Sequence, residues 1–412
     1  MTLFYFIKNS EFFSRTFNSL TDKNFRYLWI GMILIMASVN IQMLARGYLS
    51  WELTHSPIMV TIAGAGFAPP ILLFSIFGGA IVDRVERKKV LQYGQFGLLI
   101  IAMTIAISIK TETITIYHLI WSSIFQGVIW AFLMPARQAI VTQIVSKSQV
   151  NNAIALNASG MSLTTLAAPG FGGLIYGFYG PEIVYYFISF FAFISIIFTS
   201  FIPKLPLLSP VKENVIHEMK NGINYVLSNN VVMWLLVIAL TTTLLAWPFR
   251  NLLPVQIDEV FSRGPEALGL LMSMIGLGSL FGSLFVAGIR YGNSKGMILL
   301  LTSLITSVAI ILNAISTEYW ISVLLMVFLG IGDAGRRTLN TSLLMERTEE
   351  KFRGRVMGIY MMNFGLMPLG AIPLGFIAEN YSVKIAFLIP GILLLIFTLL
   401  IITLTKSIRN LK

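Results

Sequence analysis

Cysteine is absent from the sequence, and histidine occurs only three times in 412 residues. Without thiols the chain can form no disulfide and offers no thiolate ligand to a metal. The three histidines, His55, His118 and His217, lack the spacing of metal ligands. We therefore expect no metal site.

Charged residues are also scarce, at 11% of the chain, whereas about 25% is usual in a soluble protein. Apolar residues make up 56% of the chain. A soluble fold could not bury this much apolar surface. The composition therefore excludes a soluble protein and predicts an integral membrane protein with the lipid bilayer as a partner.

The motifs of nucleotide-dependent enzymes are missing or misplaced. The sequence has no phosphate-binding Gly-x-x-x-x-Gly-Lys-Ser/Thr loop, so ATP is not expected to drive the protein directly. Residues Gly330 to Gly335 spell a dinucleotide fingerprint, but they lie in an apolar run and do not follow a strand. We predict a protein that is not an enzyme and has no cofactor.

The few charges are clustered, and the intervals between them predict the number of membrane spans. A helix needs roughly 20 residues without an unpaired charge to cross a bilayer. Twelve intervals qualify as candidates, at residues 27–45, 53–82, 90–109, 113–136, 148–181, 183–203, 221–249, 267–289, 296–317, 319–332, 356–378 and 385–405. The tenth is too short alone, so its helix must carry Asp333, Arg336 and Arg337 in or near the bilayer. The predicted fold is all-α with twelve transmembrane helices.

Lysine and arginine are distributed unequally between alternate loops. With the N-terminus inside, 21 of them fall on the cytoplasmic side, and only Lys110, Arg263 and Lys384 fall outside. Positive residues favour the cytoplasmic side of a membrane. This bias predicts that both termini are cytoplasmic and explains the net charge of +11 without a nucleic acid partner.

A polar stretch at residues 204–230 divides the chain into two bundles of six predicted spans. The predicted boundaries are a cytoplasmic amphipathic segment at 1–26, a first bundle at 27–203, the linker at 204–230, a second bundle at 231–405 and a cytoplasmic tail at 406–412. Residues recur between the bundles at offsets near 202, pairing Gly173 with Gly375, Tyr179 with Tyr381, Arg46 with Arg250, and Arg137 with Arg337. Internal duplication is typical of proteins whose halves rock about a central site. The alternative is chance matching of common apolar residues.

The loop after the second span, from Gly78 to Lys89, resembles the signature of the major facilitator superfamily, a glycine followed four residues later by an acid and then a basic cluster. The matching residues are Gly79, Asp83, Arg84, Arg87 and Lys88. The resemblance implies a cytoplasmic gate in which Asp83 contacts a helix N-terminus or an arginine of the other half. Glu86 replaces a glycine that is usual in the family. Anchoring by positive residues would explain the basic cluster but not Asp83.

A second resemblance lies in span five, where Ala168 to Gly173 is similar to the Gly-Pro-x-x-Gly-Gly motif of drug antiporters in this superfamily. Pro169, Gly172 and Gly173 would form a bend, because proline removes a backbone hydrogen bond and glycine permits close packing. Packing alone is the alternative. Residues 119–127 match the family's proton-coupling motif except that Ser123 replaces its arginine. The whole pattern resembles the branch of the enterobactin exporter and macrolide efflux proteins.

Six charged residues fall inside or at the edge of predicted spans, and five are positive: Arg46, Arg137, Arg250, Arg336 and Arg337 against Asp333. A buried arginine tends to face water, a partner or a ligand. We predict that Arg46, Arg250, Arg137 and Arg337 bind a substrate with negative groups and that Asp333 and Arg336 couple transport to an ion. The alternatives are a structural ion pair at Asp333 and an Arg137 side chain that reaches the lipid headgroups.

The resemblance implies a secondary transporter of the bacterial cytoplasmic membrane that works by alternating access as a monomer. We expect it to export a small siderophore-like or drug-like molecule as an antiporter, with the proton as coupling ion. The alternatives are uptake of a small anionic metabolite and translocation of a lipid.

Overall fold

A computed structural model of the chain describes residues 16–82, 84–204, 215–288 and 294–411. These residues form helices and loops, with no strand among them. Ten of the described helical segments are long and apolar enough to cross a membrane. The predicted all-α membrane fold is thus confirmed.

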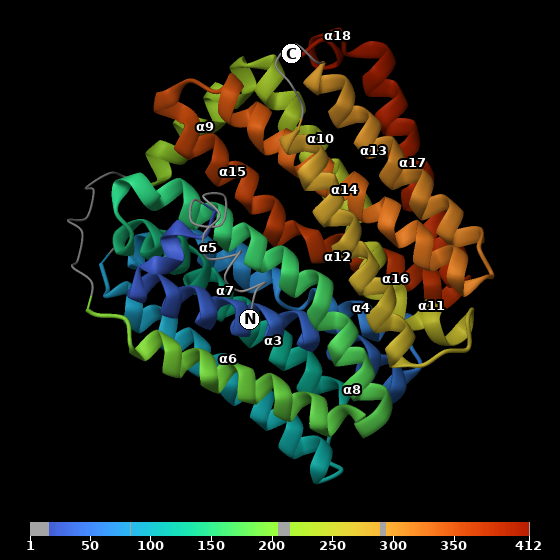
Figure 1. Cartoon of the computed structure of the whole chain (residues 1–412). Helices are drawn as coiled ribbons and strands as arrows, with labels where there is room; N and C mark the ends of the chain where they lie inside the picture. Colours follow the sequence, from blue (N-terminus) through green and yellow to red (C-terminus); the bar gives the residue numbers. More distant parts are fainter. Residues whose placement is uncertain (1–15, 83, 205–214, 289–293, 412) are drawn as a thin grey trace, which may run out of the picture.

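The first half of the chain forms the helices coloured blue to green in Figure 1. They are α3 (Lys23–Thr54), α4 (Pro57–Ala65), α5 (Ala68–Val82), α6 (Arg87–Lys110), α7 (Ile116–Ile144) and α8 (Val150–Ser200). Helix α3 begins where the Asp22 carboxylate accepts hydrogen bonds from the backbone N–H groups of Asn24 (2.8 Å) and Phe25 (3.0 Å). Such a cap satisfies N–H groups that have no partner within the helix.

The second half forms the helices coloured yellow to red in Figure 1. After the linker helix α9 (Val215–Ser228) come α10 (Asn230–Ala246), α11 (Leu253–Glu259), α12 (Pro265–Ala287), α13 (Lys295–Ile315), α14 (Tyr319–Arg347), α15 (Arg353–Leu366), α16 (Ala371–Asn380), α17 (Val383–Leu404) and α18 (Lys406–Arg409). Helix α14 carries Asp333, Arg336 and Arg337 in its interior, as the short tenth interval predicted.

The number of crossings depends on two segments. The candidate span from Lys147 to Ser200 has 54 residues, which is more than twice the roughly 20 residues that one crossing needs. Gly180, with φ of 80°, separates two helices within it. Helices α15 and α16 follow one another through the short helix η5 (Met367–Gly370) and are not among the ten candidates. The count of twelve therefore stays a prediction that requires α8 to cross twice and α15 with α16 to cross once.

The helices run back and forth between two ends of the molecule. We call one the linker end, where α3 begins and where α5, α7 and α14 end, next to α9 and α18. We call the other the far end, where α3 and α11 end and α4 and α12 begin. The described lysines and arginines that the sequence predicts to be cytoplasmic lie at the linker end.

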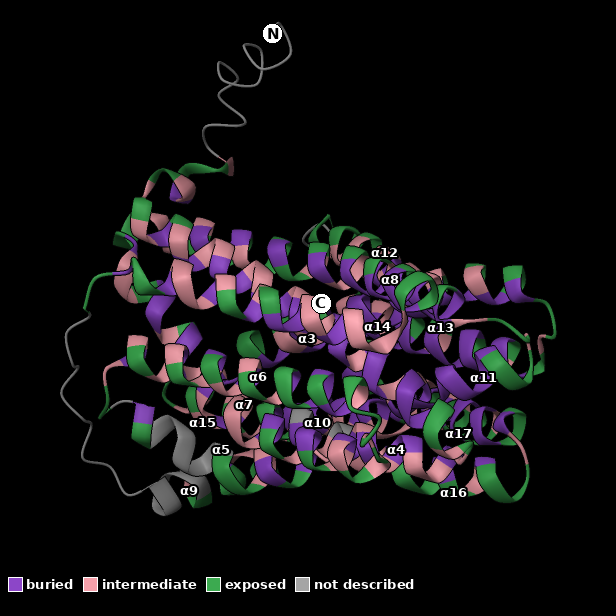
Figure 2. Ribbon diagram, turned by 90° about the horizontal axis from the view of Figure 1, so that it is seen from below, coloured by how far each residue is buried: buried purple, intermediate pink, exposed green. Residues whose placement is uncertain are grey.

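The outer faces of the helices expose apolar side chains. On α6 these residues recur every three or four positions, as Tyr93, Phe96, Ile100, Met103 and Ile107. This spacing places them on one side of the helix. Figure 2 shows exposed residues along the outer helix faces and buried residues where helices pack together. A wide apolar outer surface is what a lipid-facing protein requires.

Glycines bring the two halves into close contact along α8 and α12. A Cβ atom on Gly173 would lie 2.5 Å from the Pro265 carbonyl oxygen and 2.9 Å from the Gly269 Cα atom. A Cβ atom on Gly276 would lie 2.6 Å from the Leu166 Cα atom. Larger residues at Gly173 or Gly276 would therefore separate the backbones of the two halves. Small residues play this part at many helix interfaces in membranes.

Candidate functional site

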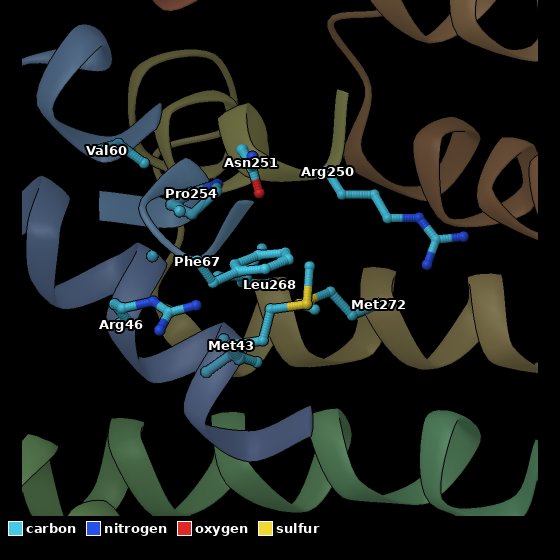
Figure 3. Close-up of a pocket in the computed structure, with 12 residues that line it drawn as sticks. Met43, Arg46, Val60, Phe67, Arg250, Asn251, Pro254, Leu268 and Met272 are labelled. Atoms are coloured by element: carbon cyan, nitrogen blue, oxygen red, sulfur yellow. The ribbon is translucent and has the colours of Figure 1, made fainter. Parts of the chain in front are cut away.

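A cavity lies between the two halves, and Figure 3 shows the side chains that line it. They are Met43, Leu44, Arg46 and Gly47 of α3, Val60, Gly64 and Phe67 in and after α4, Arg250 and Asn251 of the 3-10 helix η3 (Pro248–Leu252), Pro254 of α11, and Leu268 and Met272 of α12. The sequence explains the position of Arg250, because Pro248 cannot continue the hydrogen-bond ladder of α10. The chain turns into η3 there and places Arg250 and Asn251 at the cavity.

On the side of the first half, Arg46 is held by glutamine rather than by an acid. Its Nη1 atom donates a hydrogen bond to Gln126 Oε1 at 2.6 Å, and Gln126 Nε2 donates to Gln42 Oε1 at 2.9 Å. All three side chains are buried. Among the described residues no carboxylate lies within 4 Å of Arg46. The positive charge of Arg46 is therefore solvated by amides and not neutralised.

On the side of the second half, Arg250 meets an acid. Asp333 Oδ2 lies 3.3 Å from Arg250 Nη2 and 3.5 Å from Arg337 Nη2, while Asp333 Oδ1 lies 2.8 Å from Arg336 Nη2. Asp333 is only 6% exposed, so water screens these contacts little. Three guanidinium groups share one carboxylate, which leaves two positive charges uncompensated within this cluster.

The site also contains buried hydrogen-bond donors without partners. The Nδ2 atom of Asn251 is buried, lines the cavity and has no hydrogen-bond partner, and the Nε atoms of Arg336 and Arg337 are also buried without partners. A buried donor without a partner is unfavourable, because it has lost its hydrogen bonds to water. The site is thus suited to a ligand that brings hydrogen-bond acceptors and negative charge.

The structure brings Arg46 and Arg250 to one cavity, as the internal duplication predicts. Their guanidinium groups do not point at each other, because Figure 3 shows the Arg250 side chain directed away from Arg46. It reaches instead toward Asp333 of α14. Arg336 and Arg337 do not line the cavity themselves and are joined to it through Asp333 and Arg250.

Arg137 lies outside this cavity. It is 7% exposed, and its Nη1 atom contacts the sulfur of Met36 at 3.2 Å. A side chain buried to this degree does not extend along α7 toward a surface. The described residues provide no carboxylate within 4 Å of Arg137. Arg137 and Arg337 correspond in the sequence offset but differ in their surroundings, because Arg337 contacts Asp333 and Arg137 contacts Met36.

The residues predicted to form a cytoplasmic gate lie at the linker end, but the key acid, Asp83, is outside the described residues. Gly79 lies in α5, Arg84 is exposed, and Arg87 is buried at the start of α6. Lys88 Nζ donates to the carbonyl oxygens of Ser200 (2.8 Å) and Ile202. Lys88 thus holds the end of α8 within its own half, and the gate stays a prediction.

The predicted bend motif lies where the two halves meet. Gly173 packs against α12, and a Cβ atom on Gly172 would lie 2.8 Å from Ile41 Cγ2 of α3. Pro169 is inside α8, and the break in helical dihedral angles in this helix is at Gly180. Close packing explains the glycines of the motif, and a bend at Pro169 stays a prediction.

Sequence reasoning missed Gln126, Gln42 and Asn251. Amides carry no formal charge, so a search for charged residues within spans does not find them. A signal was present for Gln126, because it stands 207 positions before Asp333, close to the offset of 204 that pairs Arg46 with Arg250. Among the described residues no group of three or more histidine or acidic residues could hold a metal ion.

An apolar outer surface and a cationic cavity between two packed helical halves are features expected of a membrane transporter. The chain belongs to the transmembrane secretion effector family of the major facilitator superfamily, whose family model matches residues 14–410. The predicted superfamily is thus confirmed, and the protein is a multi-pass membrane transporter of small molecules.

Several curated proteins resemble the chain over most of its length. The staphyloferrin A transporter of Staphylococcus aureus is 21% identical, over 86% of this chain and 89% of that protein. Macrolide efflux protein A of Streptococcus pyogenes is 23% identical, over 90% of this chain and 93% of that protein. The enterobactin exporter of Shigella boydii is 24% identical, over 80% of this chain and 77% of that protein. In fold, a crystal structure of a nucleoside transporter matches with a TM-score of 0.77 at 13% identity, covering 93% of this chain and 100% of that chain.

Proposed function

We propose that the protein exports a small anionic molecule rich in oxygen acceptors from the cytoplasm of a bacterium by alternating access. The observation that carries this proposal is the set of donors at one cavity between the halves, Arg46, Arg250 and the unpartnered Asn251 amide. Arginine binds carboxylate and similar groups through two parallel hydrogen bonds. A ligand between Arg46 and Arg250 would contact both halves at once, so its binding would respond to their relative movement.

The names of the relatives support a substrate of this kind. Two are transporters of siderophores, staphyloferrin A and enterobactin, and one is a macrolide efflux protein. A siderophore holds iron through several oxygen atoms, many of them anionic. Those atoms would match guanidinium and amide donors better than they would match a purely apolar cavity.

The direction and orientation rest on two further features. The lysines and arginines at the linker end favour a cytoplasmic position for that end. The hydrogen bonds between described residues that join the two halves lie at the far end. Both features support a state in which the cavity is closed toward the outside and receives its substrate from the cytoplasm.

The contact between Asp333 and Arg250 favours a second candidate, uptake of a small anion together with protons. An ionised Asp333 competes with an anionic substrate for Arg250. Protonation of Asp333 would release Arg250 for the substrate, so proton and anion would bind together. Positive coupling of this kind is the property of a cotransporter, whereas an antiporter requires that one ligand weaken the other.

Transport by purified protein in liposomes of known orientation separates the two candidates. Labelled iron-free staphyloferrin A, enterobactin and a macrolide would be added with a pH gradient of either direction. An exporter driven by proton exchange accumulates substrate in vesicles whose cytoplasmic face is outward and whose lumen is acidic. Accumulation only when the proton gradient and the substrate move in the same direction would favour cotransport. Accumulation of the macrolide alone, or of no candidate under either gradient, would contradict the anion proposal.

A further inference from the structure

Among the described residues, three hydrogen bonds at the far end join the two halves. Trp51 Nε1 of α3 donates to Asp258 Oδ2 of α11 at 2.8 Å. Glu379 Oε2 of α16 accepts from the Ser56 hydroxyl at 2.5 Å and from the Ile58 backbone N–H at 3.0 Å. Each bond pairs a donor of the first half with a carboxylate of the second half. Hydrogen bonds between two described residues join the halves at this end and not at the linker end.

Glu379 acts as a helix cap supplied by the opposite half. Helix α4 begins at Pro57, directly after Ser56, and the first N–H groups of a helix have no partner within it. The Glu379 carboxylate satisfies the N–H group of Ile58 and places a negative charge at the positive end of the α4 dipole. When α16 moves away from α4, this N–H group must find water instead.

The packing beside Glu379 makes this contact depend on closure of the far end. A Cβ atom on Gly375, one helical turn before Glu379, would lie 3.0 Å from the Ile58 Cα atom and would overlap the Thr61 side chain. The backbones of α16 and α4 therefore touch where the carboxylate binds. A small separation of the two helices would break both hydrogen bonds of Glu379.

The hydrogen bond between Trp51 and Asp258 connects closure of the far end to the cavity. Trp51 is five residues beyond Arg46 on α3, and Asp258 is eight residues beyond Arg250. At about 1.5 Å of rise per helical residue, the Trp51 contact lies roughly 8 Å from Arg46 along α3. The two segments that line the cavity with arginine are thus the segments that Trp51 and Asp258 join at the far end.

We propose that Glu379 and Asp258 form a latch that holds the far end closed while the cavity is accessible from the linker end. This assignment rests on the proposed alternating access. Glu379 and Asp258 act as positioning residues, because they would set the relative position of the halves and are not among the residues that line the cavity. Removing either carboxylate is expected to favour the state that is open at the far end.

The absence of cysteine permits a direct test, since one introduced cysteine is the only thiol in the full-length chain. The reporter is Met43→Cys in the cavity, labelled with a membrane-impermeant maleimide from each side of oriented vesicles. In Glu379→Ala and Asp258→Ala, labelling from the far end should rise about tenfold, as expected for losing hydrogen bonds to a charged acceptor. Glu379→Gln, which can still accept hydrogen bonds, should show a smaller rise.

The matched control is Glu346→Ala. Glu346 pairs with Lys295 at 2.8 Å, both residues belong to the second half, and the substitution removes the same charge without touching the contact between halves. Its labelling from the far end should equal that of the reporter alone. Thermal unfolding of each variant, followed by fluorescence in detergent, checks that a rise in labelling does not reflect unfolding.

Failure of the latch can be told apart from failure of alternating access. If labelling from the two sides shifts when substrate is added but is unchanged by Glu379→Ala and Asp258→Ala, the halves move and the latch assignment is wrong. If labelling occurs equally from both sides and no substrate shifts it, alternating access itself is wrong. A rise of similar size in Glu346→Ala would also overturn the latch.

Discussion

Each half of the molecule places an arginine beside the central cavity, but the two arginines are bound by different groups. In the first half Gln126 of α7 accepts from Arg46, and in the second half Asp333 of α14 binds Arg250. The elements correspond, but one acceptor is an amide and the other is a carboxylate. The two halves thus place an arginine at the same cavity but differ in the charge of the group that binds it.

Under the proposed function, this difference would give the two halves distinct tasks. An amide cannot titrate near neutral pH, so the charge of Arg46 is permanently available to an anion. A carboxylate can be neutral or ionised, and it can also exchange partners among Arg250, Arg336 and Arg337. We infer that the first half provides a constant attraction for substrate, while the second half provides the element that an ion can change.

The largest effect is expected when the carboxylate of the second half is lost. Asp333→Asn leaves three arginines without their acid, and breaking a buried ion pair commonly costs about 3–5 kcal/mol. We expect gradient-driven transport to be abolished, as measured in vesicles at matched protein abundance. If Asp333 is only structural, the variant should instead be lost from the membrane. A variant that still concentrates substrate against its gradient would remove Asp333 from coupling.

A somewhat smaller effect is expected when either cavity arginine loses its charge. Arg46→Gln and Arg250→Gln retain hydrogen-bonding capacity but should each weaken binding of an anionic substrate about tenfold to hundredfold, since a charged hydrogen bond contributes about 1.5–3 kcal/mol. Binding of a neutral ligand should change little. Equilibrium binding to purified protein checks this, and unchanged affinities in both variants would mean that the arginines serve only structure.

One substitution gives both halves an acid beside the cavity arginine. Gln126→Glu would place a carboxylate beside Arg46 and neutralise it, so affinity for an anion should fall about tenfold while a neutral ligand binds as before. Gln126→Leu is the companion variant, because it removes the hydrogen bond without adding charge. An anion affinity that is lowered equally by both substitutions would show that the amide contact, and not charge, is the determinant.

The smallest effect is expected at Arg137. Its guanidinium contacts the Met36 sulfur and lies outside the cavity, so Arg137→Gln should leave substrate affinity within about twofold, as for an independent site. Direct binding measurements would check this expectation. A loss of substrate affinity above tenfold would indicate that Arg137 contacts the substrate in another conformation of the protein.

The sequence predicted the features that depend on charge and periodicity. Intervals free of charge located the membrane helices, because a lipid-exposed charge is unfavourable. The offset between the halves paired Arg46 with Arg250 in the sequence, and both residues line the same cavity. The pairing of Arg46 with Gln126 and of Ser56 with Glu379 could not be predicted in this way. Those contacts depend on how helices rotate and pack against each other, which single-chain periodicity does not contain.

We propose above all that Arg46 and Arg250 together select negative charge at the cavity. The most direct measurement is the affinity of purified protein for a carboxylate siderophore and for its methyl ester, in the parent and in the double variant Arg46→Gln/Arg250→Gln. The parent is expected to prefer the free acid at least about tenfold, and the double variant is expected to bind acid and ester equally. A double variant that keeps the full preference for the acid would show that the two arginines do not select negative charge.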